Sequence, residues 1–171
     1  TSNEGWGLSL TESLMTGTMI IPNVTGGMQD QCRFTNEKGE WIDFDSDFPS
    51  NHRGTYKEHG KWAEPVFPSN ISLAGSPGTP YIFDDRCSPE DVAAALNFVY
   101  GLPKDIRDQN GKAGREWITS KEAQMTAEQM CLNVIEGIED TFTKFKPRKR
   151  FDVFKAEKPS PKKVTHALTG Y

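Results

Sequence analysis

Two carboxylates, Glu4 and Glu12, flank a glycine-containing turn near the start of the chain, with seven residues between them. Carboxylates accept hydrogen bonds from neighbouring hydroxyl groups, as an acidic residue does from a ribose in dinucleotide-binding folds. The turn leads into a predicted helix, whose first N–H groups favour an anion such as a diphosphate. The pattern therefore predicts half of a sugar-nucleotide site, with the amides of Gly7, Leu8 and Ser9 facing phosphate.

Glycine and an aromatic residue make up the turn itself. Gly5 and Gly7 accept unusual φ values and let a ligand approach the backbone closely. Trp6 between them either stacks on a sugar or packs on the domain. The turn lacks the third glycine of a dinucleotide fingerprint and follows no visible strand, which disfavours an oxidoreductase.

A structural explanation of the same residues remains open. Ser9 and Glu12 have the spacing of a capping box, in which Ser9 caps the helix and Glu12 bonds back to the Ser9 N–H. Glu4 alone is compatible with an ordinary surface carboxylate, since exposed acids are common.

The elements after Glu12 extend the pattern. An apolar helix, a glycine stop at Gly17, a predicted buried strand and the pair Gly26-Gly27 follow in that order. Taken together, the stretch 4–27 resembles the signature of retaining glycosyltransferases of the GT-B fold, especially glycosyltransferase family 4. That signature has a Glu, a glycine-rich turn, a second Glu eight positions later, a strand and a Gly-Gly turn.

The resemblance implies a hexosyltransferase that moves a sugar from a nucleoside diphosphate to a hydroxyl acceptor with retained configuration. It assigns Glu4 to the donor sugar, as the catalytic candidate, and Glu12 to the ribose. No cofactor and no metal are expected, because these enzymes meet the diphosphate with cationic side chains and helix N-termini. The remaining residues assigned to donor binding are Gly5, Trp6, Gly7, Leu8 and Ser9.

The fold implied is α/β: a Rossmann-like C-terminal half-domain of a GT-B enzyme over residues 1–154, with an insertion at about 28–80. Residues 155–171 are expected to be a basic, disordered tail. The whole architecture needs an N-terminal Rossmann domain as partner, together with its upstream cationic residues. The isolated chain of 171 residues is therefore expected to be inactive. A non-catalytic binding or assembly module that keeps the same frame is the alternative.

The predicted insertion has two parts. Residues 31–35 and 41–44 flank an Asn-to-Gly turn and predict a hairpin. Residues 45–80 are rich in Pro, Gly, Ser and Asn and predict a long loop. This loop either contributes to acceptor recognition or is packed on the domain by Trp62, Val66 and Phe67. A short strand, 81–83, follows.

Metal and disulfide signals are weak. Asp45-Ser46-Asp47 and Asp84-Asp85 resemble metal-binding pairs, but neither stands in the context that such a motif requires. The three cysteines are odd in number and far apart, which favours reduced thiols. The positions of these cysteines are Cys32, Cys87 and Cys131.

Three helices are predicted after Ser88. Ser88 is a good N-cap with Pro89 at the first helical position. A second helix covers about 103–118, and its Gly111 and Gly114 lower the expected continuity. A third opens at a capping box, Thr126 to Gln129. Their apolar stripes are predicted to be core; these are Val92, Leu96 and Val99, and then Met130, Val134, Ile138 and Phe142.

The chain carries a net charge of −4, yet residues 144–163 are strongly basic. This segment could cross back over the body, contact an anionic membrane or nucleic acid, or remain solvated. We expect a helix over 145–154 that crosses back, and no nucleic-acid binding. The predicted location is the cytoplasm, with the cytosolic membrane face as an alternative. An exposed face is also expected to pair with another copy of the chain.

Overall fold

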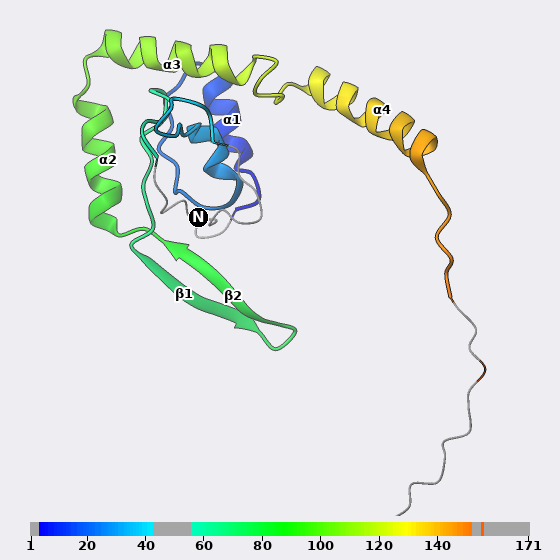
Figure 1. The fold of residues 1–171 in the computed structure, drawn as a ribbon. Coiled ribbons are helices and arrows are strands. Elements are labelled where there is room, and N and C mark those ends of the chain that lie inside the picture. Colours follow the sequence, from blue (N-terminus) through cyan, green and yellow to red (C-terminus); the bar gives the residue numbers. More distant parts are fainter. Residues whose placement is uncertain (1–3, 43–55, 152–154, 156–171) are drawn as a thin grey trace, which may run out of the picture. The chain divides into compact units, whose positions relative to one another are not determined.

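The computed structural model describes residues 4–42, 56–151 and 155. It is a mixed α/β structure, as predicted, and its elements are shown in Figure 1. The chain divides into two compact units, and the division lies inside the last helix, between Val134 and Ile135. The elements in order are α1 (Leu8–Met15), the short 3-10 helices η1 (Gly26–Met28) and η2 (Asp30–Cys32), β1 (Asn70–Ser76), β2 (Thr79–Arg86), α2 (Pro89–Gly101), α3 (Lys104–Ile118) and α4 (Ala127–Lys144).

Two extended segments, 19–24 and 62–66, run parallel beside each other. The first begins just after Gly17, whose φ of 78° ends α1 in the left-handed region. It corresponds to the predicted buried strand. Each of its four inter-segment hydrogen bonds is 2.9 Å long, and they run from Ile20 N to Trp62 O, Glu64 N to Ile20 O, Val66 N to Pro22 O and Val24 N to Val66 O.

Helix α3 packs against α1 at its two glycines. A Cβ on Gly111 would lie 1.9 Å from the carbonyl oxygen of Gly17, and one on Gly114 would lie 2.8 Å from Leu14 Cδ2. Both glycines are buried. The predicted helix over about 103–118 is confirmed, and α3 runs unbroken through both glycines from Lys104 to Ile118. Their role is to let two helices approach closely.

The core gathers residues that are far apart in the sequence. Trp62 stacks on Trp117 with ring centroids 5.0 Å apart and an interplanar angle of 15°. Val66 is buried and Phe67 packs against the core. Of the two alternatives for this loop, packing on the domain is therefore confirmed for 62–67. The buried cluster consists of Leu14, Ile20, Val24, Cys32, Phe34, Trp62, Ala63, Trp117 and Ile118.

The predicted hairpin near Asn36 is present only around its turn. Asn36 donates its N–H to Glu40 O at 2.9 Å, and Gly39 adopts a φ of 78°. Thr35 pairs with Trp41 in an antiparallel bridge. Residues 31 and 32, expected to be in a strand, instead belong to η2, and residues 43 and 44 lie outside the described part of the chain.

Strands β1 and β2 form an antiparallel hairpin. The prediction of a loop as far as Pro80 is wrong, because β1 occupies residues 70–76. The predicted strand 81–83 lies within β2, but it pairs with β1 and does not join the parallel segments. Leu73 is directly opposite Phe83, and both are about 60% exposed. The hairpin therefore carries an uncovered apolar patch.

The three predicted helices are present, but the apolar stripes of α2 and α4 are not part of the core. The Ser88 side chain accepts the Asp91 N–H at 3.0 Å, as expected of an N-cap. Thr126 likewise accepts the Gln129 N–H at 3.2 Å. However, Leu96 of α2 is 54% exposed, and α4 has no buried residue. A helical period predicts a face that can be buried but not what covers it.

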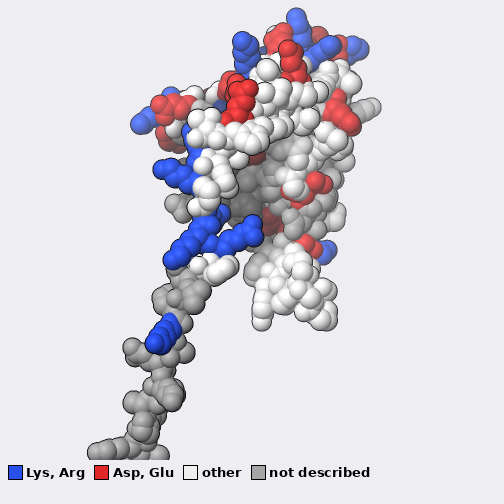
Figure 2. Space-filling model, turned by 90° about the vertical axis from the view of Figure 1, so that its right-hand side faces the viewer, with Lys and Arg blue, Asp and Glu red and all other residues white. Residues whose placement is uncertain are grey.

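The segment after α4 differs from the expected crossing helix. Residues 145–151 are not helical, and both Phe145 and Phe151 are largely exposed. Residues 152–154 and the predicted disordered tail, apart from Lys155, lie outside the described residues. Figure 2 shows the cationic side chains that follow α4, with no acidic residue among 145–151. Among the helices that the structure describes, none is long and apolar enough to span a membrane.

Candidate functional site

The turn that precedes α1 adopts a left-handed conformation at Gly7. Its φ of 82° and ψ of 59° place it at the N-cap of a helix that starts at Leu8. A side chain at this position would be strained, and its Cβ would lie 2.8 Å from Met28 Cγ. The capping box expected of Ser9 and Glu12 is wrong, because Ser9 is already helical and no side chain caps α1. The first-turn amides are therefore not used by a capping side chain.

The pair Gly26-Gly27 lies directly against the turn that carries Glu4. A Cβ on Gly26 would be 2.0 Å from the Glu4 carbonyl oxygen, and one on Gly27 would be 2.3 Å from the Gly5 carbonyl oxygen. Both clashes involve backbone, which cannot swing away as a side chain can. The two ends of the 4–27 motif thus meet in space, and glycine is required at both contact points.

The two carboxylates have different surroundings. Glu4 is partly buried, and one of its carboxylate oxygens accepts the Trp6 N–H at 3.4 Å. Glu12 lies on the exposed surface of α1. A carboxylate has about four lone-pair sites, so this hydrogen bond leaves Glu4 able to accept from a ligand hydroxyl.

A polar network that the sequence did not reveal holds the turn. Trp6 donates its indole N–H to Thr11 Oγ1 at 2.9 Å, and Thr11 donates onward to Gln31 Oε1 at 3.1 Å. Gln31 Nε2 closes the circuit on the Trp6 carbonyl oxygen at 2.8 Å. Thr11 and Gln31 are buried. No local pattern marks these two residues as a pair, because they are 20 positions apart.

An apolar groove of about 610 Å³ lies beside this turn. Trp6, Leu8 and Glu12 line it, so the structure brings these three predicted residues to one hollow. Glu4 is not among the lining residues, so a single hollow shared by both carboxylates is not what this groove offers. The complete lining is Trp6, Leu8, Thr11, Glu12, Met15, Ala123, Gln124, Met125, Thr126, Ala127 and Met130.

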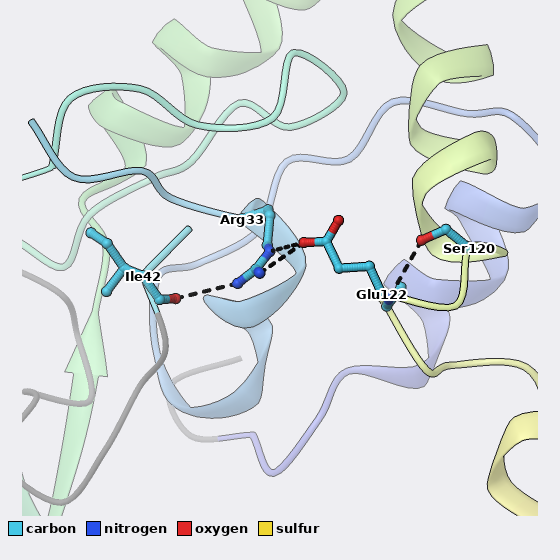
Figure 3. Close-up of polar contacts among 5 residues, drawn as sticks. Arg33, Ile42, Ser120 and Glu122 are labelled. Atoms are coloured by element: carbon cyan, nitrogen blue, oxygen red, sulfur yellow. Dashed lines mark hydrogen bonds and ion pairs between the residues drawn. The ribbon is translucent and has the colours of Figure 1, made fainter. Parts of the chain in front are cut away.

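A second, smaller hollow of about 260 Å³ is bordered by an ion pair. Arg33 Nη2 lies 2.8 Å from Glu122 Oε1, and its Nη1 donates to Ile42 O at 3.4 Å (Figure 3). Trp117 also lines this hollow, and its buried indole nitrogen has no hydrogen-bond partner. The pair joins the segment after η2 to the connection between α3 and α4.

The acidic pair Asp84-Asp85 has a structural role at its second residue. The Asp85 carboxylate is buried and accepts the Thr25 hydroxyl at 2.7 Å. Asn23 Nδ2 donates to the Asp85 carbonyl oxygen at 3.3 Å. These bonds tie β2 to the segment before Gly26. No group of potential metal ligands occurs among the described residues, and Asp45-Ser46-Asp47 lies outside them.

All three cysteines are free, and their environments differ. Burial, reinforced by the negative charge of Asp30, raises the pKa of the Cys32 thiol far above its usual value. Burial also raises the pKa of Cys87, followed by the effect of Asp91. Cys131 is exposed. A raised pKa keeps a thiol protonated and unreactive, so neither Cys32 nor Cys87 has the character of a nucleophile.

In chemical terms, the turn offers backbone amides at a helix start, a carboxylate on each side and an aromatic residue that lines a groove. Amides of this kind favour anions, and carboxylates favour hydroxyls. No family model, curated protein or solved structure matches this chain.

Proposed function

We propose that this chain is the donor-binding part of a retaining GT-B glycosyltransferase, which moves a hexosyl unit from a nucleoside-diphosphate sugar to a hydroxyl acceptor. The observation that carries the proposal is the contact of Gly26-Gly27 with the backbone of Glu4 and Gly5. These are the two ends of the sequence motif, and their close approach needs residues without a side chain.

Each part of the turn has a role in this proposal. The amides of Gly7, Leu8 and Ser9 bind the diphosphate, because anions are favoured at the start of a helix. Glu12 accepts hydrogen bonds from the ribose. Glu4 accepts hydrogen bonds from the donor sugar and is the catalytic candidate. The approach of Gly26 holds the Glu4 backbone in place.

The parallel pairing of 19–24 with 62–66, together with α1 and α3, supports a Rossmann-like half-domain as the frame. In that architecture α1 follows the turn and leads into the next parallel strand. A GT-B enzyme also needs a first Rossmann domain, which faces the second across a cleft. We therefore expect the 171-residue chain alone to bind donor weakly and to transfer no sugar.

Calorimetric titration with uridine and guanosine diphosphates, with and without their sugars, tests donor binding. A charge-assisted hydrogen bond contributes about 1.5–3 kcal/mol, so Glu12→Ala should weaken binding roughly tenfold to more than a hundredfold. Glu116→Ala is the matched control, because Glu116 is also an exposed helical carboxylate but lies on α3. Absence of binding at millimolar ligand, or equal losses in both variants, would refute the donor site.

An assembly module without catalytic activity is the second candidate. The uncovered apolar residues of the β1–β2 hairpin favour it, since Ile71, Leu73 and Phe83 are each at least 47% exposed. Exposed apolar patches of this kind commonly mark interaction surfaces. This candidate predicts that no nucleoside diphosphate binds and that the Glu12→Ala variant behaves as the parent chain does.

A further inference from the structure

The extended segment 19–24 has one paired edge and one open edge. Its even-numbered residues bond to 62–66. Because successive residues of an extended chain direct their backbone groups to opposite edges, Met19 and Ile21 direct theirs away from 62–66. No described residue bonds to the N–H or C=O of either one. The next odd-numbered residue, Asn23, accepts the Thr25 N–H at 2.9 Å through its carbonyl.

The usual protection of an open edge is absent at these two residues. Proline or lysine commonly blocks such an edge in natural sheets. Pro22 does not, because its carbonyl accepts the Val66 N–H and its nitrogen therefore belongs to the paired edge. Met19 and Ile21 are uncharged, keep their N–H groups and are partly exposed.

The open groups are complementary to themselves. In an antiparallel pair, opposite residues alternate between those that exchange two hydrogen bonds and those that exchange none. If Ile20 faces Ile20 of a second copy, Met19 faces Ile21 and Ile21 faces Met19. Both of these outer pairs are then hydrogen-bonded, and both N–H and both C=O groups of each copy are used. The arrangement closes under a two-fold axis and pairs the open backbone groups of Met19 and Ile21 on both copies.

We infer that the open edge at Met19 and Ile21 is a contact between two copies of this chain. The two-stranded parallel pair of each copy becomes part of one four-stranded sheet across the two-fold axis. The contact is independent of donor binding, since it uses neither carboxylate of the turn.

Sedimentation equilibrium over a range of protein concentrations, with two charge variants, tests this contact. The variant Met19→Lys/Ile21→Lys places like charges directly opposite each other across the axis, and Met19→Glu/Ile21→Glu does the same with the opposite sign. We expect the parent chain to dimerise and each variant alone to associate at least tenfold more weakly. Mixing the two variants should restore the dimer, because every lysine then faces a glutamate.

The variant Ile71→Lys/Leu73→Lys is the control, because it places the same charges on the exposed apolar patch of the hairpin. It should dimerise as the parent chain does. A parent chain that stays monomeric, a mixture that fails to dimerise, or loss of the dimer in this control would overturn the inference. A monomer would indicate that the edge is filled by a strand from elsewhere or by none.

Hydrogen exchange tests the same contact on the parent chain, so the result does not depend on whether a substituted chain folds. Dimerisation should slow exchange at the Met19 and Ile21 amides as the concentration rises. The Ile20 and Val24 amides, which already bond to 62–66, should be protected at every concentration. Exchange at Met19 and Ile21 that does not depend on concentration would contradict the contact.

Discussion

The substitution Gly111→Ala should separate α3 from α1. The new Cβ would lie 1.9 Å from the Gly17 carbonyl oxygen and 2.7 Å from the Gly17 carbonyl carbon, inside the 3.0 Å that real Cβ contacts respect. Gly17 itself has a φ of 78°, which limits how its backbone can move. The helices must therefore shift apart, and the contact between Leu14 and the core beside Trp62 loosens with them.

Two opposing effects set the magnitude. Overpacking in a well-packed interior costs about 1–3 kcal/mol. Replacing glycine by alanine within a helix returns roughly 1 kcal/mol. Because the clash is with backbone, we expect the upper part of the first range and a net loss of about 1–2 kcal/mol in the free energy of unfolding.

Urea denaturation followed by tryptophan fluorescence measures this loss, since Trp62 and Trp117 are stacked in the core. Gly137→Ala in α4 is the control, because a Cβ there meets nothing within 4 Å. That variant should be no less stable than the parent chain. If Gly111→Ala were as stable as the parent chain, the close packing of α1 and α3 described here would be wrong.

Two further predictions concern buried polar groups. Thr25→Val should lower the free energy of unfolding by about 1–3 kcal/mol, as measured in urea, because the buried Asp85 carboxylate loses a 2.7 Å hydrogen bond; an unchanged midpoint would contradict a structural role for that bond. Because burial raises the pKa of Cys32 above its unfolded value of 9.0, its contribution to stability is complete below about pH 9 and is lost as the pH rises further. In Cys32→Ala the free energy of unfolding, followed by the urea midpoint, should therefore fall less steeply with pH above pH 9, because unfolding releases up to one proton fewer. A thiol reagent should modify Cys131 in the native chain but Cys32 only after unfolding.

Local features were predicted well, because their causes lie within a few residues. The Ser88 cap bonds to an amide three residues away, and the Asn36 turn closes on Glu40. Gly17 ends α1 because a left-handed residue is needed there. The start of α1 was the exception, since Gly7 took the cap position that the Ser9 and Glu12 pattern predicted for Ser9.

The burial of apolar helix faces and the packing role of glycines were predicted less well, because both depend on partners that are distant in the sequence. The stripes of α2 and α4 were expected to be core and are largely exposed, whereas Gly111 and Gly114 were expected to weaken a helix and instead bring it against α1. A helical period shows that a face is apolar but does not name its neighbour.

The same distinction between local features and distant contacts applies to the candidate site. The sequence alone determined which hydrogen-bonding groups the turn can offer, namely the carboxylates of Glu4 and Glu12 and the backbone groups exposed by its glycines, because residue type and spacing decide which hydrogen bonds a short segment can make. Only the tertiary structure decided that Gly26-Gly27 lies on the Glu4 backbone and that Thr11 and Gln31 hold Trp6. Those contacts join residues about 20 positions apart, and packing selects such pairs through shape and burial, which no local pattern encodes.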